Sequence, residues 1–362
     1  MPVLKKSALA SYVKARFGAG AELLAYGPIG KETKGARYKQ YGYGAPIRLT
    51  FRTTGDKTRQ VVLGTMSPGP FGHEHPADRA QAMLWDYDCY GRLPGHIGAL
   101  DVGAFTARGE LMSVAAAKEF FLLTEWSEGD TYHKDLERLA EASRPTALDR
   151  KRSAALADYL STIHRVKRRD PHLYRRRLRE LLGHGECIMG LTDSYPDRFG
   201  FITEELLQRI EVACNAWRWR LRSQHARLSQ VHGDFHPWNV LFRRGADFSV
   251  LDRSRGEWGE PADDVTSMSI NYLFFSLCRH GTLKGPLEVL FRSFWDRYLS
   301  RSHDQDVLAA TGPFFAFRGL VLASPLWYPK LTLTVRRKIF RFIEQVLAVP
   351  RFDPADVNRY CD

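Results

Sequence analysis

The first part of the chain alternates apolar and polar residues with the two-residue period that is typical of half-buried strands. The segments predicted as strands, from this period or from their content of β-forming residues, are 21–27, 46–54, 58–66 and 119–126. Thr54, Gly55 and Asp56 separate the second segment from the third and predict a hairpin turn. The sequence ADRAQAMLWDYDCYG, residues 77–91, predicts a helix, and a turn at 127–130 ends the last strand.

Beyond residue 130 the apolar period changes to the 3.6 residues of helices, with one β-like island at 230–252. The helical spacing is carried by Leu156, Leu160 and Ile163, and by Val335, Ile339, Phe342 and Val346. This change predicts an α+β fold with a small β-rich N-terminal lobe, 1–125, that ends in a hinge. A larger, mostly helical C-terminal lobe, 126–362, follows it.

The amino-acid composition predicts a soluble globular protein. A chain of 362 residues with 44% hydrophobic and 26% charged residues is long enough for two lobes that share a cleft. No window reaches the roughly 18 apolar residues of a spanning helix, because Arg318 interrupts the most apolar stretch. Lys and Arg interrupt the N-terminus where a signal peptide would be apolar. We therefore expect a cytoplasmic protein without membrane association.

Cysteine and charge patterns exclude some functions. The five cysteines are scattered, odd in number and never form a CxxC pair, which argues against a disulfide framework and a zinc site. The formal charge of +12 is concentrated at residues 165–180, where eight basic residues accompany two acidic ones. We expect this run to be a solvated helix face and loop. A nucleic-acid partner is not expected, because no aromatic interleaving accompanies the charge.

The segment HGDFHPWNVLF, residues 232–242, concentrates the candidate chemistry. As a metal site it would use His232, Asp234 and His236, but it lacks the helix on which a histidine pair converges on zinc. It contains no Ser or Cys nucleophile, and the chain has no GxSxG elbow. A purely structural loop and a phosphoryl-transfer loop are the remaining interpretations.

Phosphoryl transfer requires a carboxylate to accept the proton of the attacking hydroxyl and oxygen ligands to hold Mg²⁺. Asp234 is the candidate base, and Asn239 is a candidate metal ligand. Asp252 supplies the carboxylate that Mg²⁺ prefers, at the end of the apolar segment FSVL. A hairpin through residues 240–251 would bring Asn239 and Asp252 side by side.

The pattern HGDxxxxN, followed by an apolar strand that ends in Asp, resembles the aminoglycoside phosphotransferase family, relatives of protein and choline kinases. The resemblance covers roughly residues 20–350 and implies a protein-kinase-like fold. It assigns His232 and Asp234 to the catalytic loop, and Asn239 and Asp252 to the metal. It also places Asp264, in the segment WGEPADDV, as an aspartate that braces the catalytic loop.

The N-terminal lobe shows both a match to the family and a departure from it. The segment FLLTEWSEG resembles the family's adenine-binding strand, so Glu125 and Trp126 are expected to meet the base through their backbone. The family carries a phosphate-binding lysine on the third strand, where this chain has Gly64. Lys31 and Lys34, in the Gly-rich segment GPIGKETKG, are candidates to supply that charge.

These observations predict a small-molecule phosphotransferase that moves the γ-phosphoryl group of ATP or GTP, with Mg²⁺, to a hydroxyl acceptor. Glu260 and Asp263 are candidates to face a cationic acceptor, although acids at a helix N-terminus are a common structural feature. Gly64 favours the alternative of a catalytically weak, pseudokinase-like nucleotide-binding or scaffold protein. The sequence leaves open the acceptor, which includes sugars, amino alcohols and nucleosides, and the oligomeric state.

Overall fold

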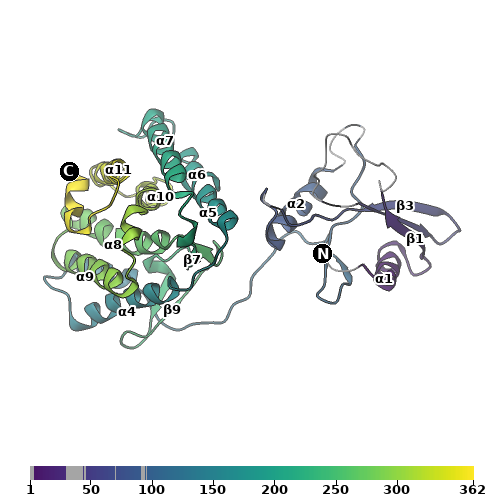
Figure 1. Ribbon diagram of the computed structural model, residues 1–362, viewed down its shortest axis with the longest axis horizontal. Helices are drawn as coiled ribbons and strands as arrows, with labels where there is room; N and C mark the ends of the chain where they lie inside the picture. The colour runs from purple at the N-terminus through teal and green to yellow at the C-terminus, as the bar shows by residue number, and fades with distance from the viewer. Residues whose placement is uncertain (1–3, 30–43, 45, 70, 91–93, 95) are drawn as a thin grey trace. The chain divides into compact units, whose positions relative to one another are not determined.

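The computed structural model describes residues 4–29, 44, 46–69, 71–90, 94 and 96–362 (Figure 1). The chain divides into two compact units, Met1–Thr124 and Glu125–Asp362. The first is rich in strands and the second is mostly helical, which confirms the predicted α+β class.

The first unit is built on a three-stranded antiparallel sheet with the order β1-β2-β3. Its elements are α1 (Lys6–Phe17), β1 (Glu22–Pro28), β2 (Ile47–Arg52), β3 (Thr58–Leu63), α2 (Pro76–Cys89), β4 (Gly103–Phe105) and β5 (Leu111–Ser113). Helix α1 covers one face of the sheet, because Leu9 and Val13 are buried in one cluster with Leu49 and Phe51 of β2. The predicted hairpin between the second and third strands is confirmed.

The strand that the sequence predicts over 119–126 does not form. Residues 115–129 are not paired with any described strand, and the side chain of Phe121 is 92% exposed. A strand is stable only when a neighbouring strand pairs with its backbone groups. The β-forming residues of this segment alone are therefore not sufficient to form a strand.

The second unit contains most of the helices. Its elements are β6 (Asp130–Thr131), α3 (His133–Glu141), α4 (Ala147–Ile163), α5 (Pro171–Gly183), α6 (Ile188–Asp193), α7 (Glu204–Leu221), η1 (His225–Arg227), β7 (Ser229–Gln230), η2 (Pro237–Asn239), β8 (Val240–Phe242), β9 (Phe248–Val250), β10 (Trp258–Gly259), α8 (Pro261–His280), α9 (Gly285–Ser302), η3 (Gln305–Ala309), α10 (Gly312–Ala323), α11 (Leu333–Ala348) and η4 (Pro354–Cys361). The helices predicted from the 3.6-residue period are confirmed as α4 and α11.

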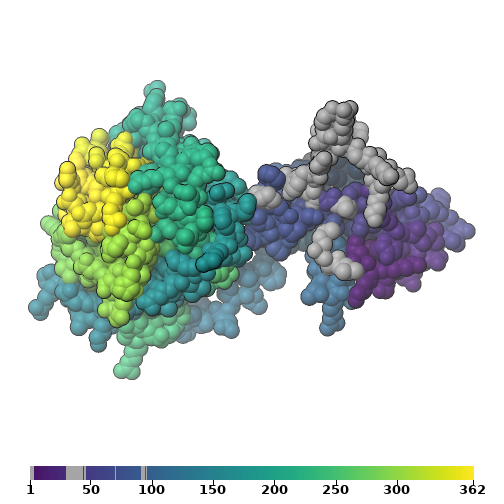
Figure 2. Space-filling model, viewed as in Figure 1, coloured from purple at the N-terminus to yellow at the C-terminus, as the bar shows by residue number. Residues whose placement is uncertain are grey.

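Helix α8 forms the centre of the second unit. Val265, Met268 and Tyr272 on this helix are fully buried, and α8 packs against α3, α9, α10 and α11. In Figure 2 the C-terminal residues, in yellow, lie next to α7, in green. Helix α11 packs against α7. In the described part of the chain, no helix combines the length and the apolar character needed to cross a bilayer.

The basic run at 165–180 is only partly a solvated face, which corrects the prediction. Arg176 is buried and pairs with Glu180 at 2.6 Å. Arg177 donates to the carbonyl oxygen of Trp258 at 2.9 Å. Lys167 donates to the hydroxyl of Ser229 at 2.7 Å. Arg177 thus ties α5 to β10, and Lys167 ties the preceding loop to β7, which is a tertiary role that the sequence alone does not reveal.

Candidate active site

Residues 232–239, which the resemblance assigns as the catalytic loop, connect β7 to β8 and end in the 3₁₀ turn η2. Gly233 has a φ of +87°, in the left-handed region that favours glycine. A β-carbon at this position would also lie 3.1 Å from the β-carbon of Arg255. The glycine of the HGD motif is therefore required by the backbone.

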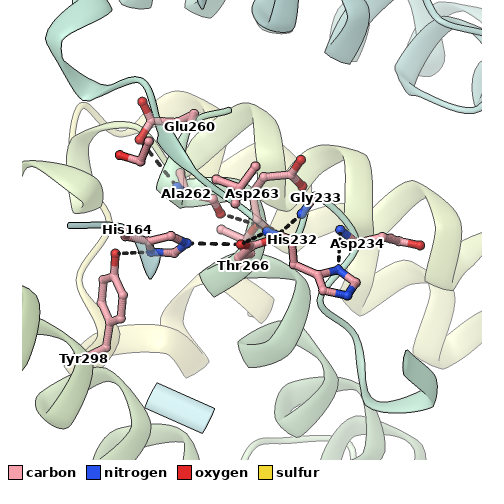
Figure 3. Close-up of polar contacts among 12 residues, drawn as sticks. His164, His232, Gly233, Asp234, Glu260, Ala262, Asp263, Thr266 and Tyr298 are labelled. Atoms are coloured by element: carbon pink, nitrogen blue, oxygen red, sulfur yellow. Dashed lines mark hydrogen bonds and ion pairs between the residues drawn. The ribbon is translucent and has the colours of Figure 1, made fainter. Parts of the chain in front are cut away.

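Asp264, in the first turn of α8, braces this loop. Figure 3 labels His164, His232 and Gly233, the residues that contact it. Its fully buried carboxylate accepts hydrogen bonds from the backbone amides of His232 and Gly233, both at 2.8 Å. Burial is the largest influence on the pKa of Asp264 and raises it, but the hydrogen bonds and the histidine contacts outweigh burial and leave the pKa below its ordinary value. A buried carboxylate with three donors is a rigid anchor.

His164 supplies the third donor and extends the brace to α9. Its Nε2 lies 3.1 Å from a carboxylate oxygen of Asp264, and its Nδ1 lies 2.8 Å from the hydroxyl of Tyr298. Burial raises the pKa of Tyr298 well above its ordinary value, so this hydroxyl keeps its proton. The two ring nitrogens of His164 therefore link the carboxylate of Asp264 to the hydroxyl of Tyr298.

Asp234, the candidate base, forms an ion pair with Arg318 of α10. The buried guanidinium of Arg318 also donates to the carbonyl oxygen of Gly233 at 3.0 Å and to Asp263 at 2.7 Å. One arginine therefore holds the loop backbone, the candidate base and an acid of α8 together. Hydrogen bonds from a guanidinium orient the carboxylates that accept them and also compensate their negative charge.

The pKa of Asp234 is held well below its ordinary range. Burial is the largest influence and raises it, but Arg318 and His236 together lower it by more. The Nδ1 of His236 accepts from the amide of Trp238 at 3.2 Å, so Nε2 carries the proton and lies 3.5 Å from the carboxylate of Asp234. Asp234 is ionised at neutral pH and is oriented on two sides.

The predicted hairpin that follows the loop is confirmed. β8 and β9 pair antiparallel, and the amide of Leu251 donates to the carbonyl oxygen of Asn239 at 2.9 Å. Asn239 is therefore opposite Leu251, and Asp252 is the next residue along the chain. Asp252 has a φ of +54°, a left-handed conformation that aspartate tolerates and that often marks functional sites.

Both candidate metal ligands have oxygens that are available. The side-chain nitrogen of Asn239 donates to the carbonyl oxygen of Asp234 at 3.1 Å, which leaves its Oδ1 without a partner among the described residues. The carboxylate of Asp252 is exposed and makes no hydrogen bond or ion pair with a described residue. An amide oxygen and a carboxylate fit Mg²⁺, which takes its remaining ligands from phosphates and water. No cluster of three or more His, Cys, Asp or Glu side chains suited to a metal occurs in the described ranges.

Glu260 and Asp263, the candidates to face a cationic acceptor, are both paired with arginines of the protein. Glu260 is buried, pairs with Arg227 at 2.6 Å and accepts from the hydroxyl of Tyr174 at 2.8 Å. Its charge is compensated inside the protein, so it does not face an acceptor. Asp263 is mostly buried and is engaged by Arg318. Burial raises the pKa of Asp263 despite that cation.

The candidate nucleotide-binding residues lie in the sequence before the second unit's helices, far from residues 232–264. The backbone groups of Glu125 and Trp126 form no hydrogen bond with a described residue, and the indole of Trp126 donates to Glu128 at 2.8 Å. Lys31 and Lys34 lie outside the described residues. Gly64 directly follows β3, and a β-carbon there would meet no atom within 4 Å.

Two residues at this site are absent from the sequence-based candidates. Arg318 is a lone cation in the otherwise apolar helix α10, and that isolation was a signal in the sequence. His164 directly follows α4, and nothing local in the sequence connects it to Asp264, 100 positions away. Both residues act through contacts between distant segments.

Solved structures similar to this chain include several kinases of small molecules. An ethanolamine kinase of Plasmodium vivax is 11% identical, with a TM-score of 0.36 over 94% of this chain and 80% of the other. A choline kinase of Cryptosporidium parvum is 10% identical, with a TM-score of 0.34 and coverages of 99% and 92%. The amicoumacin kinase hAmiN is 12% identical, with a TM-score of 0.41 and coverages of 98% and 97%.

A comparison with curated protein sequences gives no match. The family model described as "Phosphotransferase enzyme family" matches residues 103–285, half of the chain, including the catalytic loop, the hairpin and Asp264. The chain therefore belongs to this phosphotransferase family.

Proposed function

We propose that this protein transfers the γ-phosphoryl group of ATP or GTP to a hydroxyl group of a small molecule. The observation that supports this most directly is the arrangement within residues 232–252. An ionised and oriented carboxylate, Asp234, precedes a hairpin that presents the free oxygens of Asn239 and Asp252. In this proposal the unit Met1–Thr124 contributes to nucleotide binding, and Glu125 and Trp126 meet the base through their backbone.

The chemistry assigns a separate task to each residue. The acceptor oxygen bonds to the γ-phosphorus while the bond from that phosphorus to the bridging β–γ oxygen breaks, and the hydroxyl proton passes to Asp234. The low pKa of Asp234 makes it a weak base, so its main contribution is to orient the hydroxyl and to take the proton late in the reaction. Mg²⁺, held by Asn239 and Asp252, would neutralise negative charge on the phosphates.

The compensated acids favour a neutral or weakly charged acceptor over a polycation. Asp234 and Asp263 share the charge of Arg318, and Arg255 contributes further positive potential at both carboxylates. A polycationic acceptor binds best where carboxylates lack internal partners. Sugars, nucleosides and monoamino alcohols are therefore the first compounds to test.

A catalytically weak nucleotide-binding protein is the second candidate. The specific observation in its favour is Gly64, which leaves the end of β3 without the lysine that kinases use for the phosphates. This alternative predicts magnesium-dependent nucleotide binding without acceptor-stimulated turnover.

The test is a nucleotide-consumption screen with ATP and GTP, with and without Mg²⁺, over a panel of hydroxylated acceptors. Asp234→Asn is the matched control, because it keeps the size of the side chain and removes the proton acceptor. Acceptor-dependent turnover that wild type shows and the variant lacks supports the phosphotransferase. Turnover that is equal in both proteins contradicts the role of Asp234.

A further inference from the structure

One face of the β1-β2-β3 sheet is open. The alternation along β2 directs Leu49 and Phe51 into the core under α1, so Arg48 points to the opposite face. The register places Val62 of β3 directly beside Arg48. The side chain of Val62 is 59% exposed, so this face is available to a ligand.

Arg48 lies between two glycines on the open face. Gly27 of β1 is its direct neighbour in the register, and Gly64 is two residues beyond its other neighbour, Val62. A β-carbon at either glycine would meet no atom within 4 Å. Cβ atoms of direct neighbours are about 5 Å apart and those of diagonal neighbours about 7–8 Å, distances that a long side chain spans. The arginine therefore has free space on both sides, and a ligand can approach the backbone closely.

The guanidinium of Arg48 has no partner among the described residues, and the side chain is exposed. The three strands carry two other arginines, and both are engaged. Arg52, on the same face, pairs with Asp56 at 3.3 Å. Arg59 of β3 is on the α1 side, with its guanidinium 5.5 Å from the ring centroid of Phe17. Arg48 is thus the unengaged cation of these strands.

Phosphoryl transfer of the kinase type uses a lysine on the third strand to bind the nucleotide phosphates. On the open face, β3 presents Gln60 and Val62, and Gly64 follows, so this strand offers no cation there. A guanidinium matches two phosphate oxygens at once and keeps its charge at any physiological pH. Arg48 has the charge, the reach and the space to supply the missing contact from the adjacent strand.

We propose that Arg48, on β2, binds the phosphates of the nucleotide in place of a lysine on the third strand. This inference rests on the proposed function, because it takes the ligand to be a nucleoside triphosphate with Mg²⁺. It assigns Gly64 a role other than inactivation: the absence of a side chain there leaves room for the arginine and the phosphates.

The test measures the Kd of MgATP and MgGTP by calorimetry for wild type, Arg48→Ala, Arg52→Ala and the double variant Arg48→Ala/Gly64→Lys. Loss of a charge-assisted hydrogen bond predicts a roughly 10- to 100-fold weaker Kd for Arg48→Ala. Arg52→Ala is the matched control, because it removes a charge from the same face that Asp56 already engages. The double variant should recover part of the affinity, because a lysine after β3 restores the cation on the neighbouring strand.

A second ligand separates phosphate binding from other effects. This ligand is the nucleoside of the preferred triphosphate, adenosine or guanosine. Its affinity should be equal in wild type and Arg48→Ala, because a nucleoside has no phosphates. Equal MgATP and MgGTP affinities of wild type and Arg48→Ala overturn this inference and leave the proposed function intact. An equal loss in Arg52→Ala also overturns it, since the effect would then be general electrostatics. If wild type binds neither nucleotide, the proposed function fails together with the inference.

Discussion

Arg318 forms an ion pair with Asp234 across 84 positions of sequence, and the pair joins α10 to the catalytic loop. The same guanidinium holds the carbonyl oxygen of Gly233 and the carboxylate of Asp263. The ionisation and the orientation of the candidate base therefore depend on a residue of a distant helix as well as on its neighbour His236. Arg318 is a positioning residue in this arrangement, because it acts through Asp234.

Replacing Arg318 with Met should shift the pH dependence of the reaction. Burial alone raises the pKa of Asp234, so loss of the cation should raise that pKa from its depressed value. In wild type, protonation of Asp234 should produce no decline of kcat/KM between pH 5 and pH 8. In the variant an acidic limb should appear in that range. The free energy of unfolding should also fall by about 3–5 kcal/mol, because two carboxylates lose a buried partner. Arg318→Lys, which keeps a charge, is the control, and an unchanged pH profile in the Met variant argues against the positioning role.

Asp234→Asn should lower kcat by at least about 100-fold, since positioned acid–base assistance contributes typically 10²–10⁴ in rate. The Kd of the nucleotide should stay nearly unchanged, because the carboxylate acts on the acceptor. Single-turnover kinetics with an acceptor from the screen, together with calorimetry of MgATP, measure both quantities. A large change in Kd with little change in kcat would point to a binding role instead.

Asp252→Ala should abolish magnesium-dependent nucleotide binding while leaving the thermal unfolding temperature nearly unchanged. The carboxylate is exposed and has no partner in the described chain, so its removal leaves no buried group unpaired. Asp247→Ala is the matched control, because Asp247 is an acid of the same hairpin that pairs with Arg243 at 2.7 Å. A magnesium titration that is identical in wild type and Asp252→Ala rules out this metal site.

Asp264→Asn should lower the free energy of unfolding and make that free energy less sensitive to a fall in pH. Because the pKa of Asp264 is lowered in the folded state, its carboxylate stabilises the fold above the ordinary pKa of about 4. That contribution is lost as the pH falls through the folded-state pKa. The stability of wild type should therefore fall below pH 4 more steeply than that of the variant. Urea unfolding from pH 3 to pH 7 measures this, and parallel curves for the two proteins would contradict the assignment.

Reversing a charge in the basic run should lower the thermal unfolding temperature more where the side chain is more buried. Arg175→Glu with Arg179→Glu should change the thermal unfolding temperature little, because both side chains are exposed and their charges are screened within about 10 Å at 0.1 M salt. Arg177→Glu should lower it clearly, because it breaks the contacts with Glu180 and Trp258. Equal effects of the two reversals would show that burial does not govern this segment.

The sequence by itself determined the features that depend on neighbouring residues. The apolar segments 240–242 and 248–251 and the turn between them were sufficient to predict the hairpin, because adjacent short strands joined by a short turn pair antiparallel. The change of apolar period from two to 3.6 was sufficient for the α+β class, because each period describes a single element.

The tertiary structure decided which charges are compensated and which remain available. Glu260 and Asp263 are candidates in the sequence to face a cationic acceptor, but Arg227 and Arg318 approach them from distant segments. The segment 119–126 is rich in β-forming residues, but no described strand pairs with it. Ion pairs and strand pairing join segments that are far apart in the chain. Their partners are set by the packing of the whole unit, which no local pattern records.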